Sequence, residues 1–245
     1  MHEIIKALHS LKPLGYSLSE FFNLLMLRFK AERHLRDTCK FHHLDENIHR
    51  NLLLLIFSLL IRSPGNRFRY ESYPSIFSLP PDEEVGNANM RQSFLFAKRL
   101  CEKVLLSNQY FILIHSPLKK FNVGDGYLDW LTSSVGSNRI SGRALLPLTP
   151  HLCVYFCTPN FMRSTPNCAS FIAAPWIVDR INEFTQIYSR DYLFFVGTPP
   201  ELKDHFSQRQ FLTHSKRADD LIDMLDEVAG AKRIVKKGII SFGPY

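Results

Sequence analysis

Residues 52–61 read Leu-Leu-Leu-Leu-Ile-Phe-Ser-Leu-Leu-Ile, the longest apolar run in the chain. A helix needs roughly 17–25 apolar residues to cross a bilayer, so this run is too short for a membrane span. A helix that is apolar on nearly all sides is instead enclosed by other elements of a fold. The sequence therefore predicts a buried helix over residues 45–62, in which Leu55 and Leu59 are almost fully enclosed and which Pro64 and Gly65 bring to an end.

Apolar residues at helical spacing predict further helices on both sides of this run. The first is expected to begin at Ser17, where Ser17 and Glu20 form a capping box. Three others are expected over residues 89–106, 177–188 and 218–228. The stretch 72–89 is rich in proline and contains three consecutive acidic residues, which indicates a long loop.

Beyond residue 106 the pattern changes to short β-rich runs, at residues 110–114, 143–146, 152–157, 192–196 and 238–242. We expect these runs to pair as a small mixed or antiparallel sheet. The predicted fold class is α+β, with N-terminal helices packed against that sheet. A single domain over residues 1–245 is expected, with a helical part at about 1–106 and a sheet-containing part at about 107–245.

Composition and cysteine usage place the chain among reduced, globular proteins. Hydrophobic residues make up 45% and charged residues 22% of the chain, which is ordinary globular usage. Neither a secretory leader nor a membrane anchor is indicated, so a cytoplasmic location without membrane contact is expected. The five cysteines are odd in number and unpaired in spacing, which predicts free thiols.

A basic and aromatic segment follows the apolar run. The formal net charge is +7, although the charged residues are spread along the chain. Arg62, Arg67, Arg69 and Tyr70 interleave guanidinium groups with an aromatic ring, and such a surface could grip phosphate and stack a base. The alternative is helix capping and packing of the arginine stems. Nucleic-acid contact through Arg67, Arg69 and Tyr70 is therefore one of two interpretations.

No motif for a known cofactor or metal is found. The chain has no phosphate-binding loop, nucleophile elbow or paired Cys-x-x-Cys, so neither cofactor nor metal is predicted. The densest set of potential ligands matches no standard zinc spacing and is expected to form a polar corner between helices. These residues are Cys39, His42, His43 and His49.

A loop expected over residues 122–128 is surrounded by the residues that come closest to an acid–base arrangement. Asp125 and Asp129, with His115 nearby in sequence, could supply general acid–base chemistry. Carboxylates beside glycine are more often turn formers, so a structural role in a turn is the alternative to catalysis.

Three segments in order resemble an uncharacterised bacterial and fungal family known as domain of unknown function 4238. They are residues 53–67 (LLLIFSLLIRSPGNR), 146–156 (LPLTPHLCVYF) and 178–189 (VDRINEFTQIYS). The resemblance covers roughly residues 45–196 and implies no assigned activity. It departs at the N-terminus, where the family's His-x-x-Pro segment is not found. It also departs at a strand end, where His115 replaces the acid of the family's Thr-Ser-Asp-Asn-Pro.

We expect the strand end at His115 to be the best single position for a site residue, because strand ends can direct a side chain into a cleft. Arg62, Asp179 and Asn182 complete the candidate site. The first hypothesis is an intracellular binding or regulatory protein whose partner is unknown, with a homo-oligomer or a protein partner left open. The alternative is an enzyme that acts on nucleic acid in bacterial conflict or phage defence.

Overall fold

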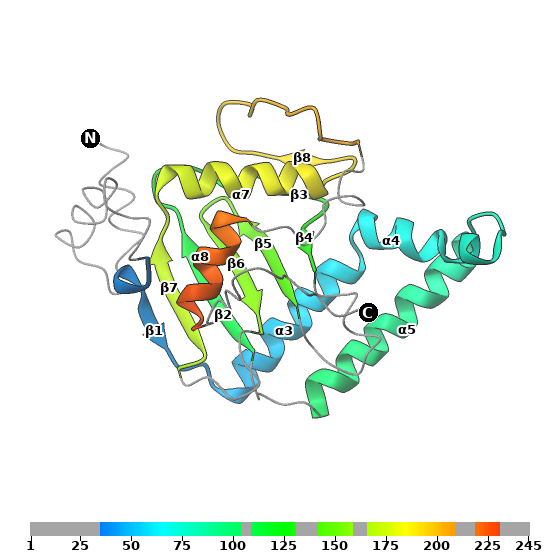
Figure 1. Cartoon of the computed structure of the whole chain (residues 1–245), viewed down its shortest axis with the longest axis horizontal. Coiled ribbons are helices and arrows are strands. Elements are labelled where there is room, and N and C mark those ends of the chain that lie inside the picture. Colours follow the sequence, from blue (N-terminus) through cyan, green and yellow to red (C-terminus); the bar gives the residue numbers. More distant parts are fainter. Residues whose placement is uncertain (1–34, 104–108, 131–141, 159–165, 209–218, 231–245) are drawn as a thin grey trace, which may run out of the picture.

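A six-stranded mixed sheet forms the centre of the molecule (Figure 1). The computed structural model describes residues 35–103, 109–130, 142–158, 166–208 and 219–230. The strand order is β1-β7-β2-β6-β5-β4, with β2 and β7 parallel and every other pair antiparallel. These strands are β1 (Lys40–His42), β2 (Tyr110–His115), β4 (Leu128–Asp129), β5 (Arg143–Thr149), β6 (Leu152–Cys157) and β7 (Cys168–Ile172).

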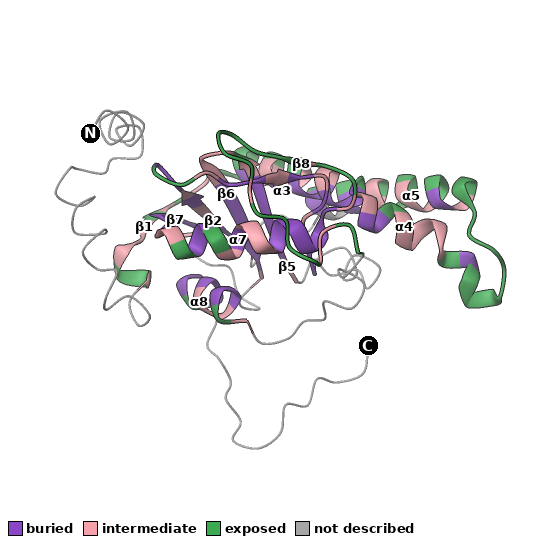
Figure 2. Cartoon of the chain, turned by 90° about the horizontal axis from the view of Figure 1, so that it is seen from above, coloured by how far each residue is buried: buried purple, intermediate pink, exposed green. Residues whose placement is uncertain are grey.

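Helices cover both faces of the sheet, so the predicted α+β class is confirmed. Helices α3 (Glu46–Ile61) and α5 (Glu83–Lys103) pack on one face, and α7 (Pro175–Tyr188) and α8 (Asp220–Val228) on the other. Figure 2 shows the buried strands between these two layers. Both faces of a strand are then enclosed, and side chains alternate between two cores. On β2, Phe111 joins the core with α3, whereas Ile112 joins the core with α7 and α8.

Helix α3 begins one residue after Asp45, whose side chain accepts hydrogen bonds from the backbone N–H groups of Asn47 and Ile48. The predicted helix is confirmed, but its predicted enclosure is wrong on one side. Leu55 is 46% exposed and Leu59 is only partly buried, whereas Phe57 and Leu60 are fully buried. The reason is geometric, because a helix lying on a sheet buries one side and turns the other outward.

Pro64 starts a helix that the sequence interpretation missed. Helix α4 (Pro64–Glu71) has Ser63 as its N-cap and Pro64 in its first turn, a position where proline needs no hydrogen-bonded N–H. A short 3-10 helix, η5 (Tyr73–Phe77), then leads to α5. Asp82 caps α5 by accepting a hydrogen bond from Val85, so the helix begins well before the predicted residue 89. The acidic run is a helix start rather than part of a long loop.

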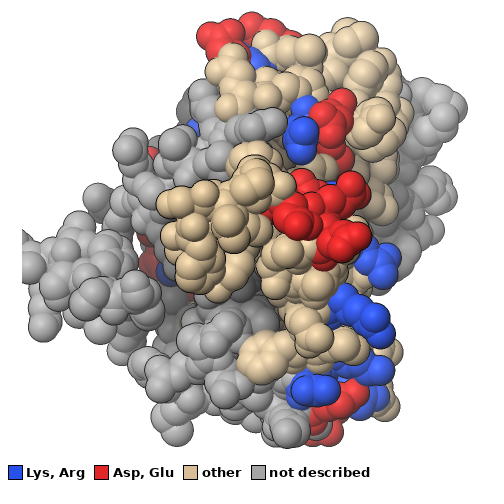
Figure 3. All heavy atoms as spheres, turned by 90° about the vertical axis from the view of Figure 1, so that its right-hand side faces the viewer, with Lys and Arg blue, Asp and Glu red and all other residues tan. Residues whose placement is uncertain are grey.

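Helices α4 and α5 project beyond the sheet as an arm (Figure 1). The face seen in Figure 3 carries acidic and basic side chains next to each other, with the largest acidic group near its centre and no uniform basic surface. Ile76 and Phe77, near the tip of the arm, are 71% and 65% exposed.

Three strands of the six-stranded sheet were not predicted from the sequence. β1 and β7 were missed, as was the two-residue strand β4, and β1 lies in the half that was expected to be helical. The remaining predicted strands and the helices at residues 177–188 and 218–228 agree with β2, β5, β6, β8 (Leu193–Phe194), α7 and α8. The predicted helix at Ser17 and the strand at 238–242 lie outside the described residues. In the part of the chain that is described, no helix is long and apolar enough to cross a membrane.

A small second sheet lies beside α7. Its strands are β3 (Val123–Gly124) and β8, which pair antiparallel. Gly124 and Gly126 approach the end of α7 so closely that a Cβ at either position would meet Ser189 Oγ or the Tyr188 carbonyl oxygen at 1.8 Å. Only glycine fits at these two positions, and this contact fixes the 123–128 segment against the helix.

Candidate functional groove on helix α7

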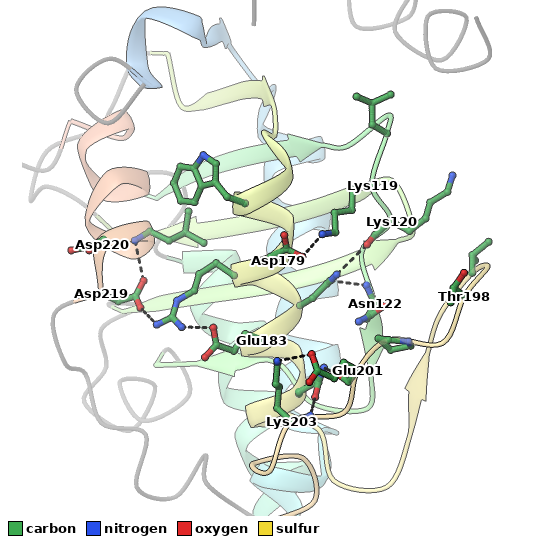
Figure 4. A pocket seen from close by; sticks show the side chains of 18 residues that line it. Lys119, Lys120, Asn122, Asp179, Glu183, Thr198, Glu201, Lys203, Asp219 and Asp220 are labelled. Atoms are coloured by element: carbon green, nitrogen blue, oxygen red, sulfur yellow. Dashed lines mark hydrogen bonds and ion pairs between the residues drawn. The ribbon is translucent and has the colours of Figure 1, made fainter. Parts of the chain in front are cut away.

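A groove of about 880 Å³ lies over the outward side of α7 (Figure 4). Its floor is the polar side of the helix, one wall is the 118–122 loop, and the other wall is the segment from Val196 to Lys203. The N-terminus of α8 closes one end through Asp219 and Asp220. The volume lies within the range of known ligand sites.

Two carboxamides on α7 hold the walls of this groove in place. The Asn182 side chain accepts a hydrogen bond from the Asn122 N–H (2.8 Å) and donates one to the Lys120 carbonyl (3.1 Å). One turn further on, Gln186 accepts from the Lys203 N–H (2.7 Å) and donates to the Glu201 carbonyl (3.0 Å). Each amide thus uses both its donor and its acceptor on a wall backbone, and the groove is formed before any ligand arrives.

Seven of the nine charged side chains that line the groove are already paired with one another. Lys119 forms an ion pair with Asp179, and Lys203 with Glu201. Arg180 bridges Glu183 and Asp219, the latter at 2.6 Å. A ligand with one strong charge would have to break such a pair before it could bind.

Apolar side chains form the rim. Leu118 and Trp176 are 38% and 37% exposed, and Val196 is 56% exposed. Val196 ends a stretch of aromatic and apolar residues that begins at Tyr192, one residue before β8. Tyr192 and Phe194 are also exposed, and their rings stack. The rim and this stretch therefore each expose apolar side chains, and exposed apolar surface of this kind marks interaction sites.

Of the predicted site residues, Asp179 and Asn182 line the groove, whereas His115 and Arg62 do not. Arg62 caps the C-terminus of α3, on the opposite face of the sheet. His115 is the last residue of β2 and lies next to His151, with ring centroids 6.3 Å apart. His115 is linked to the groove only through His151, which contacts the lining residue Lys120.

Two hydrogen bonds indicate which tautomer the His151 ring adopts. Its Nδ1 lies 2.7 Å from the Ser116 carbonyl oxygen, which can only accept, so Nδ1 carries the proton. Its Nε2 lies 2.6 Å from Lys120 Nζ and therefore accepts from the ammonium group. The imidazole thus ties the β5–β6 turn to the 116–120 loop.

Burial lowers the pKa of His115, and the neighbouring His151 lowers it further. A neutral imidazole could act as a base, but His115 Nε2 is enclosed and has no hydrogen-bond partner among the described residues. A base must reach the proton that it removes. The geometry therefore favours a structural contribution from His115.

The carboxylates of Asp125 and Asp129 also hold the fold together. Asp125 accepts hydrogen bonds from the backbone N–H groups of Arg190 and Asp191, at 2.9 and 3.0 Å. Asp129 is buried and accepts from Asn66 Nδ2 at 2.5 Å, which joins β4 to the start of α4. The turn-forming interpretation describes Asp125 better than the catalytic one does.

The candidate nucleic-acid contacts are engaged with neighbouring residues. Arg67 forms ion pairs with Glu71 (2.7 Å) and Glu83 (2.6 Å), which together raise the pKa of its guanidinium. Arg69 donates to Asn66 Oδ1 at 3.2 Å. Tyr70 is partly buried, and burial raises the pKa of its hydroxyl. Helix packing accounts for these three side chains, and their contact with nucleic acid stays a prediction.

All five cysteines are free thiols, as predicted. Burial raises the pKa of Cys39, Cys101 and Cys168 to about 12. Cys39 Sγ donates to the Leu35 carbonyl, and His42 Nε2 lies 2.7 Å from Ser170 Oγ. Among the residues that the structure describes, no group of three His, Cys, Asp or Glu side chains could hold a metal ion.

The sequence interpretation missed Gln186, Lys120 and His151. A signal for Gln186 exists, because Asp179, Asn182 and Gln186 follow one another three and four residues apart and share one side of a helix. Lys120 and His151 lie in separate loops, and only the folded chain brings them together. No protein-family model, curated protein or solved structure matches the chain, so the resemblance to domain of unknown function 4238 stays a prediction.

Proposed function

We propose that this chain is a binding protein that takes an extended peptide segment of a partner in the groove on α7. The observation that carries the proposal is the preformed groove itself, whose walls are fixed by Asn182 and Gln186. A binding site that is already ordered loses little conformational entropy when a ligand enters.

The chemistry of the lining supports a peptide rather than an anion. Three of the four basic side chains there, Lys119, Arg180 and Lys203, are paired with carboxylates, and so offer little to a phosphate group. The fourth, Lys120, donates a hydrogen bond to His151. Trp176 and the exposed residues of the 192–196 segment offer apolar and aromatic contact area, which is enriched in the centres of protein interfaces. A partner segment with apolar side chains and groups of both charges would match this lining.

Selection of random peptides displayed on phage tests the proposal. The full chain is immobilised, an enriched peptide is synthesised with a fluorescent label, and its affinity is measured by polarisation. Replacing Trp176 by alanine should weaken binding by about tenfold or more, since exposed tryptophans at interfaces are frequent hot spots. Tyr73→Ala is the matched control, because Tyr73 is an exposed aromatic residue outside the groove (51% exposed) and should leave the affinity unchanged.

Two results would overturn the proposal. One is a set of selected peptides whose affinity does not change in Trp176→Ala, although circular dichroism shows an intact fold. The other is the absence of enriched peptides together with salt-sensitive binding of DNA or RNA that Arg67→Ala and Arg69→Ala abolish, which would favour the nucleic-acid interpretation.

A further inference from the structure

His151 joins the β5–β6 turn to one wall of the groove through both of its ring nitrogens. The Nδ1–H group donates to the Ser116 carbonyl oxygen at 2.7 Å, and Nε2 accepts from Lys120 Nζ at 2.6 Å. Two backbone hydrogen bonds of 2.9 Å join the same segments, from the Ser116 N–H to the His151 carbonyl and from the Phe121 N–H to the Pro150 carbonyl. The imidazole is therefore held at a fixed position against this wall.

The two side-chain bonds of His151 respond differently to a proton. A neutral imidazole has one N–H donor and one acceptor, whereas an imidazolium has two donors. The bond from Nδ1 to Ser116 is made by a donor in both states. The bond at Nε2 exists only in the neutral ring, because a protonated Nε2 cannot accept and would lie 2.6 Å from a second cation. Protonation of His151 therefore releases Lys120 and leaves the contact with Ser116 in place.

The charged and titratable groups around His151 come from the end of β2, from the adjacent wall of the groove and from α7. Burial and His151 itself lower the pKa of His115, so that ring stays neutral to a lower pH than an ordinary histidine. The wall carries Lys119 and Lys120, and Asp179 on α7 pairs with Lys119. None of the ion pairs among the described residues involves His151. With two lysines and one carboxylate, the net charge of this cluster is +1 while His151 is neutral and +2 once it is protonated.

The released ammonium group stays within reach of the groove. Asn182 Nδ2 donates to the Lys120 carbonyl at 3.1 Å, so the backbone of Lys120 remains on the wall when its side chain moves. Figure 4 shows that side chain directed away from α7. Once it is free of His151, it can turn toward the groove that it lines.

The groove itself offers this ammonium group no free carboxylate nearby. Four of the five carboxylates that line it are paired with other cations. The fifth, Asp220, lies at the N-terminus of α8, away from Lys120 (Figure 4). The released Lys120 is therefore open to a carboxylate of a bound ligand.

We propose that His151 is a proton-controlled switch of the groove, which holds Lys120 when neutral and, when protonated, releases it to bind an Asp or Glu side chain of the partner segment. The inference rests on the proposed function, because it concerns the same groove. Imidazole side chains change charge between about pH 5 and 8, so the switch operates in this range. At acidic pH the groove selects a partner segment that carries a carboxylate opposite the 118–122 wall.

Nuclear magnetic resonance of the full chain without any peptide tests the switch itself. Between about pH 8 and about pH 5, the His151 ring should pass from the neutral tautomer with a proton on Nδ1 to the imidazolium. Nuclear Overhauser contacts between carbon-bound hydrogens of Lys120 and the His151 ring should be lost in the same transition, whereas the Ser116 amide should stay protected from hydrogen exchange. A His151 ring that stays neutral, contacts that persist when it is charged, or a simultaneous loss of the Ser116 protection would overturn the proposal.

Two substitutions separate the two bonds of His151. His151→Asn keeps a donor near the position of Nδ1 and has nothing in the place of Nε2, so Lys120 should be free at every pH. His151→Gln places an amide near the position of Nε2 and should hold Lys120 at every pH. Neither side chain titrates, and circular dichroism shows whether each variant is folded.

Random peptides displayed on phage, selected separately at about pH 5.5 and about pH 8, test the consequence for binding. The peptides selected at the lower pH should be richer in Asp and Glu, and an acidic one should bind the wild type about fivefold more tightly there, the effect of one exposed ion pair. This pH dependence should disappear in His151→Asn, His151→Gln and Lys120→Met. If folded variants keep it, the switch is overturned while the groove remains a peptide site. If no peptide is enriched at either pH, the proposed function fails, and the peptide-free spectra decide on the switch.

Discussion

The helices on the two faces of the sheet are attached by different kinds of contact. Helix α3 meets the sheet through apolar side chains, such as Phe57 and Leu60, which pack against strand residues of the same core. Helices α7 and α8 also bury apolar side chains, but polar groups fix their positions. Asp226 on α8 accepts hydrogen bonds from Tyr155 Oη and Arg143 Nε, both at 2.7 Å.

This difference bears on the groove that we propose as a binding site. Apolar packing holds a helix such as α3 without fixing the neighbouring loops. Directional hydrogen bonds fix loops as well as helices, and the groove on α7 depends on them. In the groove this is done by Asn182 and Gln186, whose side chains carry both a donor and an acceptor.

The largest expected effect is the loss of a buried ring from the α3 face. Phe57 is 0% exposed, so Phe57→Ala should lower the free energy of unfolding by about 3–5 kcal/mol. Urea denaturation measures the change. Leu55→Ala on the same helix should stay within about 0.5 kcal/mol of the wild type. Equal losses in the two variants would show that the outward side of α3 is enclosed after all.

Removing the polar contact of α8 with the sheet should lower the free energy of unfolding slightly less than Phe57→Ala does. Asp226→Ala leaves Arg143 and Tyr155 without their acceptor, and we expect a loss of about 3 kcal/mol, the low end for a broken buried pair. The low end applies because the Arg143 side chain is 39% exposed. Tyr155→Phe removes one donor only and should cost about 1 kcal/mol. A greater loss in Tyr155→Phe than in Asp226→Ala would contradict this account.

The carboxamides on α7 should affect the groove more than the stability. Asn182→Ala leaves the Asn122 N–H and the Lys120 carbonyl without their partner and should cost about 1–2 kcal/mol. Hydrogen exchange should rise at Asn122 and in the rest of the 118–122 wall. In Gln186→Ala, exchange should instead rise at Lys203. An equal rise in both walls in either variant would show that the walls are not held separately.

The smallest effect concerns pH. Because the pKa of His115 is lower in the folded chain, the unfolded chain binds a proton more readily below about pH 6.5. Stability from the neutral His115 is therefore complete above that pH and is lost as the pH falls through the lowered value. His115→Gln should flatten the decline in melting temperature below pH 6.5 and leave the value at pH 8 nearly intact. If the melting temperature of His115→Gln falls as steeply below pH 6.5 as that of the wild type, His115 makes no such contribution.

Much of the fold follows from local patterns, whereas the groove depends on long-range contacts. The α3 sequence predicts its helix because Asp45 caps it and apolar residues recur at helical spacing. Pro64 alone does not show whether a helix ends or begins there, because proline is found at both places. Ser63 indicates a beginning, because its side chain caps the N-terminus of α4. The exposure of Leu55 could not be predicted, because composition does not show which side of a helix faces the sheet.

The candidate site could be predicted only in part. Asp179 and Asn182 are on a predicted helix and do line the groove. Their neighbours there, including Lys120 and Glu201, come from loops whose positions depend on backbone contacts with α7. Such contacts join residues about 15 to 62 positions apart in sequence and leave no periodic signal.

The pairing of β7 between β1 and β2 has a consequence for how the chain folds during synthesis. Lys40 pairs with Ser170, so β1 must wait for some 130 further residues before its neighbour exists. At the usual rate of translation this takes on the order of ten seconds. We expect the backbone of β1 to lack its strand partner throughout that interval. Ribosome-bound chains arrested shortly before β7 emerges should therefore be far more sensitive to protease than chains arrested after it.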